Sequence, residues 1–274
     1  MSEILVYTHK ITNRNRFVFH FIFQDVLGVE VKMTMDANEF NLYNGVKLSY
    51  SNHNLADELH FQSRSILFET GITEQNITVS EFENTKVFFA TGKNSALPFD
   101  PFAASFYLVS RYEEYLPHIR DIYNRFDAKE SLAFQNKFLQ EPVVDTWAMM
   151  IRDEIKKKFP NFIFPGRKYK YISTIDIDNA YAYKEKGFVR SMGGYLKSIS
   201  QFDFEELKDR LKVILGTQKD PYDTYDKLLE LQKKNNLESI YFFLLGDYGV
   251  NDKNVPVQSR KFQSLIKFIS DYSK

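Results

Sequence analysis

The stretch YISTIDIDNAYAY, residues 171–183, contains an apolar, β-branched run that ends in two carboxylates, Asp176 and Asp178. Such a run predicts a strand over residues 170–176, and side chains two positions apart project from the same face of a strand. The carboxylates are therefore expected to project together from its C-terminal end. Two like charges this close need a cation or a shared proton, unless each caps a turn, which Asn179 would favour.

The residues after this strand alternate between helical and strand-like patterns. We expect helices over residues 188–215 and 222–235. A strand should follow over residues 239–245, and a final helix over residues 259–273. A strand–helix–strand–helix order implies parallel strands joined by right-handed crossovers. Ligands of such folds bind at the C-terminal ends of the strands, so Asp247 and Tyr248, with Asn179, are predicted to add contacts at the same rim.

The N-terminal part mixes short strand-like runs with helical segments. Strands are predicted for ILVYTH, VEVKMT, VKLSYS, SILFET and KVFFAT, residues 4–9, 29–34, 46–51, 65–70 and 86–91. Helices are predicted for NRFVFHFIFQDVLG, DPFAASFYLVSRYEEYLP and PVVDTWAMMIRDEIKKKFP, residues 15–28, 100–117 and 142–160. Gly28 favours a C-terminal glycine cap, and Asp100 followed by Pro101 is typical of a helix start.

A break in the pattern divides the chain. FPNFIFPGRK, residues 159–168, contains Pro160, Pro165 and Gly166, which are typical of a boundary between domains. We predict a mixed α/β domain over residues 1–165 and a second domain over residues 166–274.

Composition narrows the class of protein. Lysine plus arginine total 36 and so do aspartate plus glutamate, so no net charge favours nucleic acid or an anionic membrane. The absence of cysteine excludes disulfides, thiolate zinc sites and cysteine nucleophiles. No secretory leader and no long apolar segment is present, which predicts a cytoplasmic protein that does not insert into membranes.

Several chemistries use two carboxylates at a strand end. A calcium loop is excluded because Ala180 occupies the third ligand position of the D-x-D-x-D-G pattern. A phosphatase of the haloacid dehalogenase type would use Asp176 as nucleophile and Asp178 as acid/base, although its motif continues with Gly where Asn179 stands. A sugar-nucleotide transferase could hold a metal with the same D-x-D pattern. A non-catalytic binding or scaffold module remains the alternative outside enzymes.

Four segments resemble polysaccharide deacetylase-related proteins of Bacteroidetes-type bacteria, in which an uncharacterised N-terminal domain precedes a deacetylase-like barrel. They are STIDIDNAYAYKEKG, YFFLLGDYG, SRYEEYLP and PVVDTW. The resemblance implies that residues 166–274 form the first part of a distorted (β/α) barrel with parallel strands. It implies removal of N-acetyl groups from an acetylated glycan, with a divalent metal, zinc, as cofactor. Asp176 would be the general base and Asp178 a metal ligand, or the reverse.

The sequence departs from this family at its metal ligands. The family supplies two histidines after the aspartate pair, whereas the five histidines here all precede residue 170. They are His9, His20, His53, His60 and His118. We expect a truncated chain, or a degenerate relative, whose affinity for zinc is weak, which carries no bound metal and which has no deacetylase activity by itself.

Two further charged segments admit alternative interpretations. SNHNLADELH, residues 51–60, is interpreted as a polar loop leading into a short helix rather than as a metal cluster of His53 and His60. SRYEEYLP, residues 110–117, is interpreted as a buried ion-pair cluster, with a substrate-facing role as the alternative.

Overall fold

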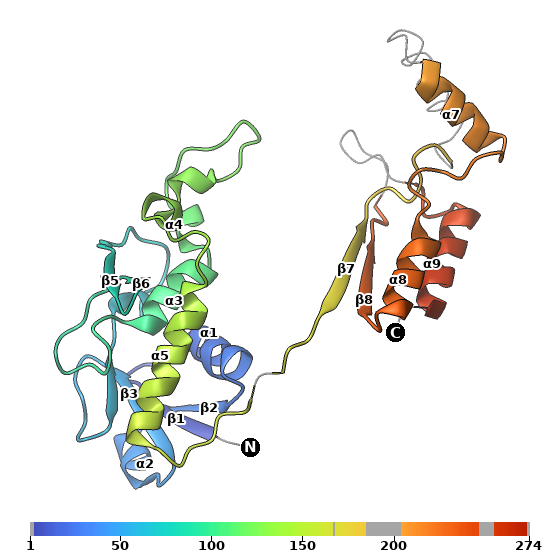
Figure 1. Cartoon of the computed structure of the whole chain (residues 1–274). Helices are drawn as coiled ribbons and strands as arrows, with labels where there is room; N and C mark the ends of the chain where they lie inside the picture. Colours follow the sequence, from blue (N-terminus) through green and yellow to red (C-terminus); the bar gives the residue numbers. More distant parts are fainter. Residues whose placement is uncertain (1–2, 167, 185–203, 247–254, 273–274) are drawn as a thin grey trace. The chain divides into compact units, whose positions relative to one another are not determined.

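The computed structural model describes residues 3–166, 168–184, 204–246 and 255–272 (Figure 1). The chain divides into two compact units, Met1–Arg167 and Lys168–Lys274. The boundary predicted after residue 165 lies beside this division.

A parallel sheet organises the unit Met1–Arg167. Its strands, in spatial order, are β2 (Glu30–Thr34), β1 (Glu3–Tyr7), β3 (Val46–Ser51) and β4 (Leu59–Gln62). Every neighbouring pair is parallel. All-parallel sheets need cover on both faces, which explains the near-continuous burial of Ile4, Leu5 and Val6 along β1.

Three of these strands follow the predicted runs, whereas three other predictions need correction. SNHNLADELH does not enter a helix, because His60 lies within β4. SILFET forms a 3-10 turn, η2 (Ser65–Leu67), instead of a strand. KVFFAT is extended only at its start, where β6 (Thr85–Val87) pairs antiparallel with β5 (Ser80–Phe82).

Helices supply most of the aromatic core of this unit. They are α1 (Asn13–Phe19), continued by the π-helical η1 (His20–Val26), α2 (Ala37–Leu42), α3 (Pro101–Val109), α4 (Leu132–Gln135) and α5 (Val143–Lys158). Phe102 of α3 is fully buried, with its ring centroid 4.9 Å from that of Phe19 and 5.4 Å from those of Tyr50 and Phe61. This side chain therefore joins α1, β3 and β4 in one core.

The ends of these helices follow local sequence signals with one exception. Gly28 has a φ of 71°, as the predicted glycine cap requires, and Asp100 caps α3 through the amides of Phe102 and Ala103. The predicted helix over residues 100–117 ends early, at Val109. Arg111 adopts the left-handed conformation, with φ 53° and ψ 42°, and the chain continues as a 3-10 turn, η3 (Tyr112–Tyr115).

The unit Lys168–Lys274 contains a second parallel sheet. Its elements are β7 (Ile172–Ile177), α7 (Phe204–Ile214), α8 (Tyr225–Lys234), β8 (Glu238–Phe243) and α9 (Arg260–Tyr272). β7 and β8 pair in parallel from Ile172–Glu238 to Ile177–Phe243, which confirms the predicted pairing. Two parallel strands do not define a barrel, so the barrel remains a prediction.

One face of this second sheet is packed and the other is exposed. Ile175, Ile177 and Phe243 belong to a core with Phe262 and Leu265 of α9. On the opposite face, the side chains of Ile240 and Phe242 remain 45% and 54% exposed. The strand alternation thus separates a helix-covered face from an open one that carries Asp176.

Candidate functional site

The end of β7 carries the carboxylate pair. Ile177 is buried in the core, so the preceding Asp176 lies on the opposite face of the sheet. Asp178 directly follows the last residue of β7, and both carboxylates are exposed. The structure therefore places the two predicted residues together at a strand's C-terminal end. Their chemical roles stay predictions.

The pair borders a hollow of about 420 Å³. Its other walls come from Asn179 and from the segment that enters α8, including Tyr222 and Thr224. The Oδ1 atom of Asn179 is buried and receives no hydrogen bond within the described part of the chain. A buried acceptor without a donor costs about 1–3 kcal/mol. Asn179 lines the hollow, and its role as a rim contact stays a prediction.

Asp220, which the sequence pattern did not single out, holds the loop after the pair. Its carboxylate accepts hydrogen bonds from the amides of Ala182, Tyr183 and Lys184 at 2.7, 2.9 and 3.1 Å. Burial raises the pKa of Asp220, but these amides and that of Tyr222 outweigh burial and hold the pKa below its usual value. The loop that follows Asp178 is therefore held by a carboxylate from the segment that precedes α8.

A second contact fixes the same loop. The hydroxyl of Tyr225, at the first position of α8, donates to the carbonyl oxygen of Ala180 at 2.8 Å. The only sequence signal for Asp220 and Tyr225 was the turn-forming DPYD segment, which predicts a loop but not its partner.

The other predicted parts of the site are the rim contacts Asp247 and Tyr248 and a set of metal ligands. Asp247 and Tyr248 lie outside the described residues. Within the described residues, no group of three or more His, Cys, Asp or Glu side chains is placed to bind a metal ion. A catalytic zinc centre takes about three protein ligands, so Asp176 and Asp178 fit part of a metal site without completing it.

His60 belongs to a buried polar group in the first sheet. Its Nδ1 lies 2.8 Å from the Oγ of Ser49, and that hydroxyl donates to the Oε1 of Glu58 at 2.6 Å. Glu58 also accepts hydrogen bonds from the amides of Leu55 and Ala56. Burial lowers the pKa of His60, which favours the neutral ring. These contacts give His60 a structural role in joining β3 to β4.

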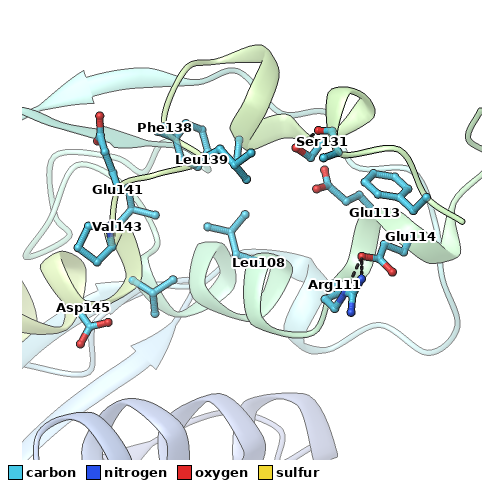
Figure 2. A pocket seen from close by; sticks show the side chains of 15 residues that line it. Leu108, Arg111, Glu113, Glu114, Ser131, Phe138, Leu139, Glu141, Val143 and Asp145 are labelled. Carbon is cyan, nitrogen blue, oxygen red and sulfur yellow. Dashed lines mark hydrogen bonds and ion pairs between the residues drawn. The ribbon is translucent and has the colours of Figure 1, made fainter. Parts of the chain in front are cut away.

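SRYEEYLP and PVVDTW meet at a separate pocket of about 410 Å³ in the unit Met1–Arg167. Figure 2 shows Leu108 between two acidic ends, with Glu113 and Glu114 at one and Glu141 and Asp145 at the other. Arg111 pairs with Glu114, but its side chain is 72% exposed. SRYEEYLP is therefore not the buried ion-pair cluster that its charges suggested, and it lines a cavity instead.

A family model matches most of the unit Met1–Arg167. Residues 4–160 match a family of unknown function, DUF7033. The chain belongs to this family. The DUF7033 match includes SRYEEYLP and PVVDTW, whereas β7 and the Asp176–Asp178 pair follow it.

The other comparisons identify no relative. No curated protein and no solved structure matches the chain. None of the helices in the described residues is long and apolar enough to cross a bilayer.

Proposed function

We propose that the Asp176–Asp178 end of β7 belongs to the site of a metal-dependent hydrolase of the polysaccharide deacetylase type, which removes N-acetyl groups from a glycan. The observation that carries the proposal is the placement of two exposed carboxylates at the end of a parallel strand, next to a hollow of about 420 Å³. This is the position at which parallel α/β folds bind ligands.

The two carboxylates have complementary roles in this chemistry. Asp178 would hold a divalent metal, which when bound polarises the N-acetyl carbonyl and lowers the pKa of water. Asp176 would accept the proton of the attacking water as general base. Asn179, which lines the same hollow, would contact the glycan at the rim. Further metal ligands are required, because the described residues of Lys168–Lys274 contribute no imidazole.

Two alternatives make different demands on the same residues. A D-x-D phosphatase would use Asp176 as nucleophile and would hydrolyse a phosphomonoester without a histidine ligand. A non-catalytic binding or scaffold module with a vestigial barrel would use neither carboxylate. The exposed face of β7 and β8 favours this last alternative, because Ile240 and Phe242 offer apolar surface for contact.

Titration of residues 1–274 with zinc tests metal binding at Asp178 separately from catalytic activity. We expect only weak zinc binding in calorimetry, abolished by Asp178→Ala, because two carboxylates without an imidazole make an incomplete zinc site. Asp271→Ala, in an exposed residue of α9, is the matched control and should leave binding unchanged. Binding that survives Asp178→Ala would contradict the assignment.

Two activity assays complete the experiment. Acetate release from an acetylated chito-oligosaccharide should be undetectable for residues 1–274, because the described residues supply only part of a zinc ligand set. Robust release that Asp178→Ala removes would show that the site is complete after all. Phosphomonoester hydrolysis lost in Asp176→Asn would instead favour the phosphatase.

A further inference from the structure

Part of the wall of the pocket in the DUF7033 unit is apolar. Leu108 lies opposite Leu139, and the buried Phe138 and Val143 add to the same surface (Figure 2). A cavity of about 410 Å³ is within the range that holds a small organic molecule or one large side chain. Its walls select for a ligand with an apolar body.

Glu113 gives this cavity a specific polar requirement. Its side chain is half-buried and points from η3 toward the middle of the pocket (Figure 2). One oxygen, Oε2, accepts a hydrogen bond from the amide of Leu132 at 2.9 Å. Among the described residues, no lysine, arginine or histidine pairs with Glu113. Burial and the neighbouring Glu114 raise its pKa, as expected of a carboxylate that lacks a cation.

The remaining charges of the lining do not supply that cation. Four carboxylates and one guanidinium, that of Arg111, line the cavity. Arg111 is engaged by Glu114 at the exposed rim. Beside Glu113 the lining carries Glu114 and a guanidinium already engaged by Glu114. A positively charged group entering there would reduce the repulsion between the two carboxylates and supply the cation that Glu113 lacks.

We propose that this pocket binds a protonated primary amine carried on an apolar body, with the ammonium group at Glu113 and the body against Leu108 and Leu139. An ammonium group would make a charge-assisted hydrogen bond to the Glu113 oxygen that Leu132 leaves free. The N-acetyl derivative of the same molecule keeps one N–H donor but loses the positive charge, so its hydrogen bond to Glu113 would be weaker. The pocket therefore distinguishes an amine from its N-acetyl derivative, independently of the chemistry at β7.

Calorimetry with matched probes tests this assignment. The first pair is 4-phenylbutylamine and its N-acetyl derivative, and the second is a blocked Leu-Lys-Leu peptide with free or acetylated lysine. Binding of the free phenylbutylamine identifies a small amine as the source, and binding of the peptide alone identifies a lysine side chain. Equal binding of free and acetylated forms, or no binding of any probe, would overturn the proposal.

Substitutions in the pocket test whether the amine binds there. Glu113→Gln keeps an acceptor for Leu132 and removes the charge, and should weaken amine binding about tenfold or more. Leu139→Ala, in a half-exposed side chain that folding tolerates, should weaken it about threefold through lost apolar contact. Glu83→Gln, in the exposed turn between β5 and β6, is the matched control and should bind as the unmodified chain does. Amine binding that is unchanged in both pocket variants would refute the location.

Discussion

At the scale of single residues, Asp100 connects three segments of the DUF7033 unit. Its Oδ1 accepts the amides of Phe102 and Ala103 at the start of α3. Its Oδ2 accepts the hydroxyl of Tyr50 and the amide of Arg64, both at 2.7 Å. The carboxyl group is fully buried, so each of these donors would otherwise be unsatisfied away from water.

Asp100→Ala should destabilise the unit strongly. Loss of a helix cap and of two further buried acceptors is expected to lower the free energy of unfolding by about 3–5 kcal/mol at pH 5. Urea unfolding can be followed by the fluorescence of Trp147, the single tryptophan, which is buried in this core. Asp36→Ala removes the exposed cap of α2 and should cost about 1 kcal/mol. Equal effects of the two substitutions would show that the buried contacts of Asp100 contribute little.

The same residue predicts a dependence of stability on pH. Burial raises the pKa of Asp100 from 3.8 to about 6, against the opposing effect of its hydrogen bonds. The folded chain then binds the proton more tightly than the unfolded chain. The stabilising contribution is complete below about pH 4 and is lost as the pH rises through about 6. Asp100→Asn does not titrate at this site, so the stability of the unmodified chain relative to this variant should fall by about 2 kcal/mol between pH 4.5 and 7.5. A constant or rising difference would contradict the raised pKa.

At the scale of elements, the end of α3 determines how the amine pocket is built. The left-handed conformation of Arg111 turns the chain so that η3 carries Glu113 and Glu114 to the cavity. Glycine or asparagine usually occupies such a position. Arginine there gave no sequence signal, and the helix was therefore predicted to stop only before Pro117.

Substitutions at Arg111 separate backbone conformation from charge. Arg111→Gly relieves the left-handed strain but loses the exposed pair with Glu114, so the free energy of unfolding should stay within about 1 kcal/mol of the unmodified value. Arg111→Val loses the same pair and places a β-branched residue where φ is positive, which should cost at least about 1–2 kcal/mol more. Urea unfolding followed by Trp147 fluorescence measures the free energy of unfolding of both variants. Similar stabilities for the two variants would mean that the turn rearranges without strain.

Elements with strong local signals were predictable, whereas those set by distant contacts were not. The apolar runs of β1 and β7, the glycine cap after η1 and the cap of α3 follow from neighbouring residues. β4 has four residues after a polar loop and is defined by its pairing with β3. In the candidate site, the period of two placed Asp176 and Asp178 correctly. Asp220 was missed because its amide partners lie up to 38 positions away in the sequence.

At the scale of the whole molecule, the two units have separate hydrophobic cores. The core of Met1–Arg167 is built around side chains such as Phe102 and Trp147, and that of Lys168–Lys274 around Ile177 and Phe262. Separate cores predict separate unfolding transitions. The second sheet also leaves Ile240 and Phe242 exposed, so its unit is expected to be the less stable of the two.

Asp220→Ala tests this independence. The substitution removes the acceptor of four backbone amides, those of Ala182 to Lys184 and of Tyr222, and should lower the stability of Lys168–Lys274 by about 3 kcal/mol or more. Hydrogen exchange in β7 and α8 should then accelerate, because opening of this unit becomes easier. The Trp147 transition in urea should not move, since that side chain belongs to the other core. Asp226→Ala, in a 70% exposed carboxylate paired with Lys219, is the control and should change neither measurement by more than about 1 kcal/mol. A shift of the Trp147 midpoint in Asp220→Ala would show that the two units unfold as one.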